Sequence, residues 1–248
     1  MTDALAPRCK FGVLAPSTNT IVQPELDDMR PPGVTNHMSR IHIPNDPIGG
    51  DADFERLIER IEAELMNAVD RVMTCEPDAL IMGMSSETFW GGLAGSEALE
   101  RRMTERAGVR VAMGSDASRR ALRRYGDVRR IAVVTPYMPV GDEQVRRFYA
   151  GCGFEIVALR GLRCESPVAI AHVDEATLRR ALLDVDDPQV EAIVQVGTNL
   201  CMARMAGEAE RWMGKPVIAI NTAIYWWALR SNGIEDRVPG FGSLLAEH

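Results

Sequence analysis

The sequence lacks any long apolar run. None of its 248 residues belongs to a stretch approaching the roughly 20 consecutive apolar residues that cross a bilayer. The first residues also lack the basic, apolar and small-residue order of a secretory signal peptide. We therefore expect no membrane contact and a cytoplasmic location.

Paired cysteines are missing as well. The five cysteines form an odd set without a Cys-x-x-Cys pair. A disulfide framework or a zinc site usually shows such pairing or spacing. We therefore expect free thiols and no bound metal. The cysteines are Cys9, Cys75, Cys152, Cys164 and Cys201.

An excess of positive charge and the common nucleotide motifs are also absent. The formal net charge is −7, whereas binding to nucleic acid needs clustered Lys and Arg. Residues 197–199 lack the Gly-x-Gly-x-x-Gly fingerprint, and no Walker loop occurs in the sequence. We therefore expect no nucleic-acid partner and no nucleotide cofactor.

The residues that are present are typical of a folded globular protein, with 46% hydrophobic and 25% charged residues. Short apolar runs alternate with stretches of helical periodicity, which predicts a parallel sheet covered by helices. The predicted strands are Phe11–Ala15, Ala79–Met82, Val109–Ala112, Ile131–Thr135, Ala192–Val196 and Pro216–Ile220. The predicted helices are Asp53–Thr74, Ser96–Ala107, Asp116–Tyr125, Gly141–Ala150, Asp174–Leu183, Met202–Met213 and Thr222–Ser231.

Three patterns of strand and following loop recur in the same order in both parts of the chain, which indicates an internal duplication. Val13–Pro16, Ala79–Gly83 and Val111–Ser115 correspond to Val133–Pro136, Ala192–Gly197 and Val217–Asn221. We predict an α/β fold of two similar three-layer α/β/α halves, Rossmann-like with parallel sheets and related by pseudo-two-fold symmetry. The halves are residues 1–118 and 119–231, and the tail 232–248 is expected to pack back on the first half.

Open parallel sheets bind ligands beyond the carboxyl ends of their strands, where loops meet helix N-termini. The loops at these places carry hydroxyl, amide and glycine groups rather than Lys or Arg, so they suit a small carboxylate. The same residue types also cap helices, which leaves a structural alternative for each loop. The candidate substrate-binding residues are Ser17, Asn19, Ser85, Ser86, Thr135, Tyr137, Gly197, Thr198 and Asn199.

Three of these loops resemble those of one enzyme family. Gly12–Thr20 resembles the Pro-Ser-Ser-Asn-Thr loop of maleate cis-trans isomerases, Met82–Gly91 the Gly-Thr-Ser loop of arylmalonate decarboxylases, and Thr135–Tyr137 their strand-end tyrosine. Over nearly its whole length the chain is similar to this branch of the aspartate/glutamate racemase superfamily. The resemblance implies that Asn19, Ser85, Ser86 and Tyr137 hold a substrate carboxylate.

The resemblance also implies thiol chemistry without a cofactor, yet the expected cysteines are missing. In the first half the family cysteine would fall at Gly83 or Met84, and in the second half close to Gly197. The nearest thiol is Cys201, which is our candidate catalytic thiol if it faces the cleft. Alternatively, it packs in the first turn of the next helix.

Glu87 is a second catalytic candidate. It lies in the donor loop next to Phe89 and Trp90, where an apolar environment would raise its pKa towards that of a general base. The alternative is a carboxylate that caps or solvates a helix start.

The expected function is a cofactor-independent enzyme, similar to maleate cis-trans isomerase, with a site for a small carboxylate or dicarboxylate between the halves. An arylmalonate-type decarboxylase is the first alternative. A carboxylate-binding protein without turnover is the second, because the family cysteines are not at the expected positions. The family also implies a homodimer or a homotetramer.

Overall fold

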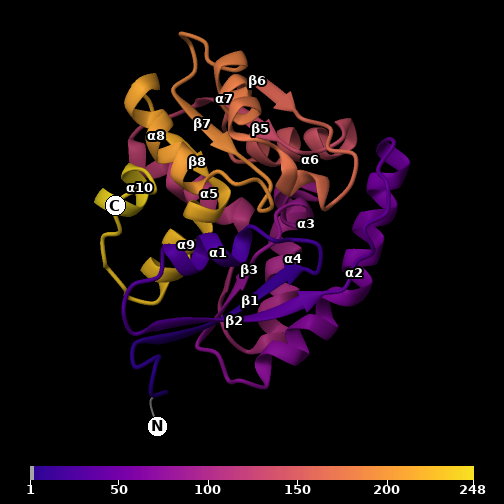
Figure 1. Ribbon diagram of the computed structural model, residues 1–248, viewed down its shortest axis with the longest axis vertical. Helices are drawn as coiled ribbons and strands as arrows, with labels where there is room; N and C mark the ends of the chain where they lie inside the picture. The colour runs from indigo at the N-terminus through magenta and orange to yellow at the C-terminus, as the bar shows by residue number, and fades with distance from the viewer. Residues whose placement is uncertain (1–2) are drawn as a thin grey trace.

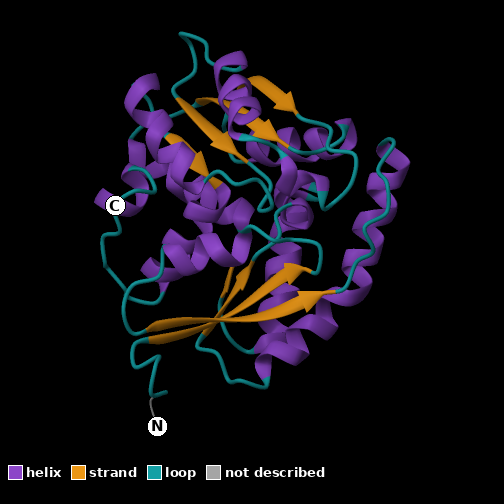
Figure 2. Ribbon diagram, viewed as in Figure 1, coloured by secondary structure: helices purple, strands orange, loops and turns teal. Residues whose placement is uncertain are grey.

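The computed structural model describes residues 3–248 and contains two parallel sheets of four strands each (Figures 1 and 2). The first sheet has the order β2-β1-β3-β4 and the second has the equivalent order β6-β5-β7-β8. The strands are β1 (Cys9–Pro16), β2 (Val34–Ile41), β3 (Ala79–Met82), β4 (Val111–Ala112), β5 (Arg130–Thr135), β6 (Glu155–Gly161), β7 (Ala192–Gln195) and β8 (Val217–Ala219). Helices flank both sheets, which confirms the predicted α/β class.

The helices alternate with the strands, as parallel sheets require. In the longest helix, α2, Phe54, Ile58 and Ile61 recur at the spacing of one helical face, and all three are buried. The helices are α1 (Val22–Asp28), α2 (Asp51–Met73), α3 (Ser86–Phe89), α4 (Gly92–Ala107), α5 (Gly114–Leu122), α6 (Pro139–Gly151), α7 (Glu175–Asp184), α8 (Ala203–Met213), α9 (Ile220–Ser231) and α10 (Ser243–Glu247). Two 3-10 turns, η1 (Arg123–Tyr125) and η2 (Ala169–His172), complete the set.

Six strands correspond to predicted apolar runs, whereas the edge strands β2 and β6 were not predicted. Thr35–Met38 of β2 is only half-buried, and no residue of β6 is fully buried. Because these two edge strands are partly exposed, neither is a continuous apolar run. The opposite edge strands, β4 and β8, are fully buried and were predicted. The C-terminal end of the predicted strand Pro216–Ile220 was also wrong, because Ile220 begins α9 and β8 ends at Ala219.

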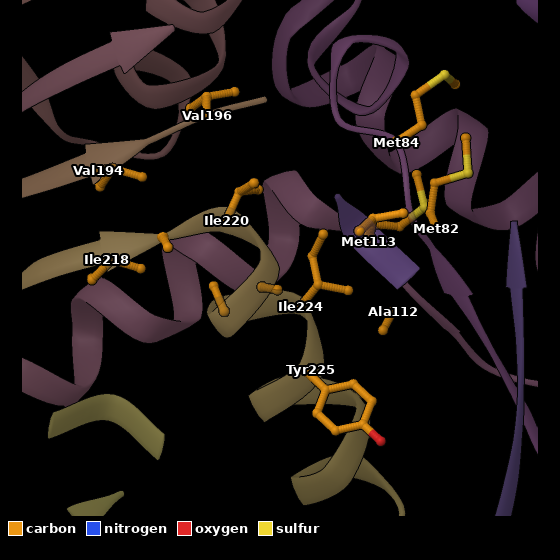
Figure 3. Close-up of a cluster of buried hydrophobic side chains, with 14 of the residues drawn as sticks. Met82, Met84, Ala112, Met113, Val194, Val196, Ile218, Ile220, Ile224 and Tyr225 are labelled. Carbon is orange, nitrogen blue, oxygen red and sulfur yellow. The ribbon is translucent and has the colours of Figure 1, made fainter. Parts of the chain in front are cut away.

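Helix α9 joins the cores of the two sheets. It starts directly after β8 and packs against α5, β3 and β4. Figure 3 shows Ile220 and Ile224 of α9 between Val194 of the second sheet and Met82 of the first. All four side chains belong to one continuous apolar cluster. The two sheets are thus held by a shared core.

The division at residues 118 and 119 stays a proposal. Residue 118 lies inside α5, and α9, which we assigned to the second half, covers strands of the first sheet. The tail 232–248 contacts both parts. Asp236 accepts a hydrogen bond from Arg8 at 2.9 Å, while the backbone N–H of Ser243 donates to Glu210 of α8 at 2.7 Å.

Candidate active site

The loops that follow β1, β3, β5 and β7 meet around one cavity of about 60 Å³. Seven of the nine predicted substrate-binding residues line it: Asn19, Ser85, Ser86, Tyr137, Gly197, Thr198 and Asn199. The loops after the edge strands β2 and β6 close the cavity, because the backbone N–H of Ile48 donates to the carbonyl of Glu165 at 2.7 Å. The carboxyl ends of both sheets therefore share one site.

Ser85 and Tyr137 form a buried hydroxyl pair at this site. Their oxygens lie 2.7 Å apart, and the backbone N–H of Thr198 donates to Ser85 Oγ at 3.3 Å. Whichever hydroxyl donates to the other, one O–H hydrogen of the pair has no acceptor among the described residues. Burial raises the pKa of Tyr137 above its ordinary value, so the phenol keeps its proton. The pair thus offers a free hydrogen-bond donor to a ligand.

Asn19 offers a second donor. Its Oδ1 accepts the backbone N–H groups of Ile21 and Val22 at 3.0 and 2.9 Å, where α1 begins. Its Nδ2 donates one hydrogen to Thr198 Oγ1 at 3.1 Å, and Thr198 in turn donates to the carbonyl of Gly83 at 3.1 Å. An amide nitrogen carries two hydrogens, and the second has no acceptor among residues 3–248.

Asn199 and Gly197 give the site its shape. Asn199 Oδ1 accepts from Thr20 N at 3.0 Å, and its Nδ2 donates to the carbonyl of Pro167 at 3.0 Å, so its side chain ties three loops together. Gly197 has φ 108°, and a Cβ there would lie 2.5 Å from Cδ of Pro136. Only glycine fits this close approach without strain.

Ser17 and Thr135 do not line the cavity, contrary to the prediction. Ser17 Oγ accepts the N–H of Ile43 and donates to its carbonyl, each at 3.1 Å. Thr135 Oγ1 accepts the N–H of Tyr137 at 3.1 Å and donates to the carboxylate of Asp142. Both hydroxyls hold cavity residues in place instead of facing the cavity.

Glu87 does not line the cavity either. Only 6% of it is exposed, and burial raises its pKa to about 8, helped by the charge of Glu62 and opposed by Arg102. Those two neighbours belong to α2 and α4, so the carboxyl faces the helical layer. The raised pKa was anticipated, but the structure does not place the group among the substrate-binding residues.

Cys201 is exposed and lies just before α8. It lines a second hollow of about 540 Å³ together with Glu25 and Arg204. Burial and the charge of Glu25 raise the pKa of its thiol. The backbone N–H groups of Met202 and Ala203 both donate to Glu25 Oε1 at 2.9 Å, which fixes the start of α8. Cys201 therefore neither faces the cleft nor packs inside.

Our reading of the sequence missed Cys164, the one cysteine among the described residues that lines the cavity. It follows β6, and its backbone N–H donates to the carbonyl of Pro136 at 3.0 Å. The apolar run Ile156–Leu159 between Gly153 and Gly161 was the available signal for the preceding strand.

Apart from Thr18 and Cys164, the remainder of the cavity wall is apolar. It includes Ile43, Ile48, Phe54, Leu57, Ile61 and Ile170. Among the described residues, no Asp, Glu, His, Lys or Arg lines the cavity, and its titratable groups are Tyr137 and Cys164. The lining suits a ligand that combines a carboxylate with an apolar part.

Within residues 3–248, no three or more His, Cys, Asp and Glu side chains are grouped so as to hold a metal ion. No helix in the same range has the length and apolarity needed to cross a membrane.

Comparisons with known proteins show the family of the chain. The family model described as arylmalonate decarboxylase matches residues 50–245. The arylmalonate decarboxylase of Bordetella bronchiseptica is 31% identical over 170 residues, covering 67% of this chain and 70% of that protein. The maleate isomerase of Pseudomonas putida is 26% identical over 255 residues, covering 96% and 97%.

Among solved structures, a Nocardia farcinica maleate cis-trans isomerase mutant with a covalently bound succinylcysteine intermediate superimposes with a TM-score of 0.87. It is 23% identical, and the match covers 97% of this chain and 99% of that one. Unliganded arylmalonate decarboxylase gives a TM-score of 0.74 at 25% identity, with coverage of 97% and 100%. Both kinds of relative are enzymes, and both share this fold.

Proposed function

Because the chain belongs to the arylmalonate decarboxylase family of enzymes, we propose that it decarboxylates a small substituted malonate without a cofactor. One carboxylate is retained and held by the free hydrogens of the Ser85–Tyr137 pair and of Asn19. The other leaves as CO₂ on the apolar side of the cavity. The observation that carries this proposal is the mixed lining of the cavity, with neutral donors from the loops after β1, β3, β5 and β7 and mainly apolar side chains from α2 and the loops after β2 and β6.

This lining matches what decarboxylation needs. When the bond to the leaving carboxylate breaks, its electron pair moves into the retained carboxylate and forms an enediolate. Donors fixed before the reaction stabilise that developing charge. A carboxylate against an apolar wall is poorly solvated, and its loss as neutral CO₂ removes that cost. The donors and the wall therefore favour the same step.

The size of the cavity favours a small substituent. The cavity is small, at about 60 Å³. A methyl or ethyl group on the malonate fits this space more readily than a phenyl group. A larger substituent requires the loops carrying Ile48 and Glu165 to separate.

Isomerisation of maleate is the second candidate, and the match to maleate isomerase over 96% of the chain favours it. Two features of the cavity support isomerisation less well than decarboxylation. Maleate keeps both carboxylates and needs donors for each, whereas the wall outside the donor loops is mainly apolar. Addition of a thiolate to the double bond needs an ionised cysteine, whereas burial raises the pKa of Cys164 to about 11.

The test is proton NMR of the purified enzyme in D₂O with methylmalonate, phenylmalonate, maleate and aspartate. We expect a malonate to yield CO₂ and the monocarboxylate deuterated at the α-carbon, and we expect Ser85→Ala to lose this turnover. Ser118→Ala is the matched control. Ser118 Oγ and Tyr149 Oη form a similar buried pair, 2.8 Å apart, and neither residue lines the cavity. Conversion of maleate to fumarate with no malonate turnover would establish the second candidate instead.

The resemblance also supports a homodimer or homotetramer. Light scattering coupled to size-exclusion chromatography measures this assembly, which would exceed the 27.3 kDa of one chain. A cytoplasmic location stays a prediction from the sequence.

A further inference from the structure

Thr198 contacts two of the proposed carboxylate donors, Ser85 and Asn19. Its backbone N–H donates to Ser85 Oγ at 3.3 Å, and its hydroxyl accepts one hydrogen of Asn19 Nδ2 at 3.1 Å. The same hydroxyl donates to the carbonyl of Gly83 at 3.1 Å. Thr198 follows β7 of the second sheet, whereas the other three residues follow strands of the first. The orientation of these donors therefore depends on where Thr198 lies.

The carbonyl of Thr198 is held in turn by Asn221, in the first turn of α9. Asn221 Nδ2 donates one hydrogen to this carbonyl at 3.0 Å and the other to Glu25 Oε2 at 2.6 Å. Asn221 Oδ1 is buried without a partner among the described residues. Turning the amide over would leave both acceptors without a donor, because the amide oxygen would then face two oxygens. Glu25 and Thr198 together therefore fix the orientation of Asn221.

Glu25 belongs to α1, which packs against α9 (Figure 1), and it closes a ring of hydrogen bonds. Its Oε1 accepts the two backbone N–H groups at the start of α8, so both carboxylate oxygens are engaged. Asn19 Oδ1 accepts the N–H groups where α1 begins, so the ring runs from Asn19 through α1 to Glu25. It returns through Asn221 and Thr198. Glu25 does not line the cavity, so it acts on the donors from outside.

We propose that Glu25 is a positioning residue of the active site, which acts through Asn221 on Thr198 and so fixes the carboxylate donors before substrate binds. This inference rests on the decarboxylase function proposed above. Donors fixed in advance stabilise the charge of the enediolate without reorganising at the moment of reaction. A displacement of about 1 Å in such a group lowers the rate by about 10²-fold. Loss of the ring is therefore expected to lower kcat in a protein that still folds.

Glu25→Gln tests this role with a minimal change of shape. The N–H groups of Met202 and Ala203 need an acceptor, so the amide oxygen of the new side chain faces them. Its NH₂ group then faces Asn221 Nδ2, which places two donors against each other. Asn221 relieves this contact by turning its oxygen towards the new amide, and it thereby withdraws its hydrogen from Thr198. A change outside the cavity is thus transmitted to the donors inside it.

The experiment is a double-mutant cycle on kcat for malonate decarboxylation, with Glu25→Gln, Asn221→Ala and the two combined. We expect each single variant to lose about 10–100-fold, the upper figure corresponding to a displacement of about 1 Å. We expect the combined variant to lose no more than Asn221→Ala, because Glu25 acts through Asn221. Glu210→Gln is the matched control. Glu210 also accepts backbone N–H groups from outside its own helix, those of Val217 and Ser243, and it does not line the cavity.

The outcomes separate the two proposals. If wild type turns over a malonate and Glu25→Gln keeps kcat within threefold, the positioning role is wrong and the decarboxylase function stands. The role is also wrong if the two single losses multiply in the combined variant, or if Glu210→Gln loses as much kcat as Glu25→Gln. If wild type turns over no malonate, the function itself is wrong and the positioning role is lost with it. Circular dichroism checks the folding of each variant, and Asn221→Leu replaces Asn221→Ala if that variant fails to fold.

Discussion

Replacing Tyr137 with Phe removes one oxygen from the cavity. In the wild type, Tyr137 Oη and Ser85 Oγ lie 2.7 Å apart and together present one free O–H hydrogen. After the change, Ser85 keeps its own hydrogen but loses the partner that orients it. Loss of one prearranged oxyanion donor costs about 10²–10³ in kcat, or about 2.7–4 kcal/mol of transition-state stabilisation. Because Ser85 still carries a hydroxyl hydrogen, this figure is the most that the substitution costs. We expect kcat for malonate decarboxylation to fall by more than threefold and by up to this amount.

Tyr149→Phe is the matched control for this change. Tyr149 is also fully buried, and its hydroxyl lies 2.8 Å from Ser118 Oγ, in a pair outside the cavity. Each substitution removes one buried hydrogen bond, so each is expected to cost about 0.5–1.5 kcal/mol of stability. For a chain of this size, that lowers Tm by about 2–4 °C per kcal/mol.

The two variants therefore separate stability from catalysis. Thermal unfolding followed by circular dichroism is expected to show similar losses for both, while steady-state kinetics show a fall in kcat only for Tyr137→Phe. The donor argument fails if Tyr137→Phe keeps kcat within threefold of wild type. It also fails if Tyr149→Phe loses as much kcat as Tyr137→Phe.

Three further predictions follow from groups in or near the site. Cys201→Ala is expected to keep wild-type kcat, because Cys201 does not line the cavity. A large loss of turnover in the NMR assay would show instead that Cys201 takes part in the reaction. Gly197→Ala is expected to lose about 1–3 kcal/mol in thermal unfolding, since φ 108° and the Cβ contact with Pro136 both disfavour a side chain, and an unchanged Tm would contradict this. The pKa of Glu87 is raised from 4.5 to about 8, so the folded state binds this proton more tightly than the unfolded chain. Between those pH values the free energy of unfolding falls as pH rises, by at most about 1.4 kcal/mol per pH unit from this group. Urea titrations across pH are expected to show a shallower fall in Glu87→Gln, and identical slopes would exclude the effect.

Central strands were predictable from the sequence because both their faces are buried. The runs Phe11–Ala15 and Ile131–Thr135 are almost wholly apolar, and they form β1 and β5 in the middle of the two sheets. Their ends then located the donor loops, including Asn19 and Tyr137. The carboxyl end of a buried parallel strand therefore locates a loop of the site from sequence alone. It does not say which residue of the loop faces the cavity, because Ser17 and Thr135 come from the same strand ends and do not line it.

The positions of Cys201 and Glu87 could not be predicted in the same way. Both are within a few residues of a donor loop, but each has entered or approached the next helix, where direction changes by about 100° per residue. Cys201 is turned to the surface because α8 is fixed at its start by the distant Glu25. Glu87 is turned towards α2 and α4 because α3 begins at Ser86. Long-range contacts of this kind leave no local signal.

The two kinds of loop divide the chemistry of the cavity between them. Loops after β3 and β5 bring the proposed carboxylate donors Ser85 and Tyr137, whereas loops after β2 and β6 bring Ile48, Ile170 and Cys164. The donors are tied into the shared core by buried hydrogen bonds, while the edge loops rest on half-buried strands. In the proposed function, substitutions in the loops after β2 and β6 change the fit of the substrate's substituent and leave the proposed carboxylate donors in place. We therefore expect differences in the loops after β2 and β6 to change which substituent is accepted more than which carboxylate donors are used.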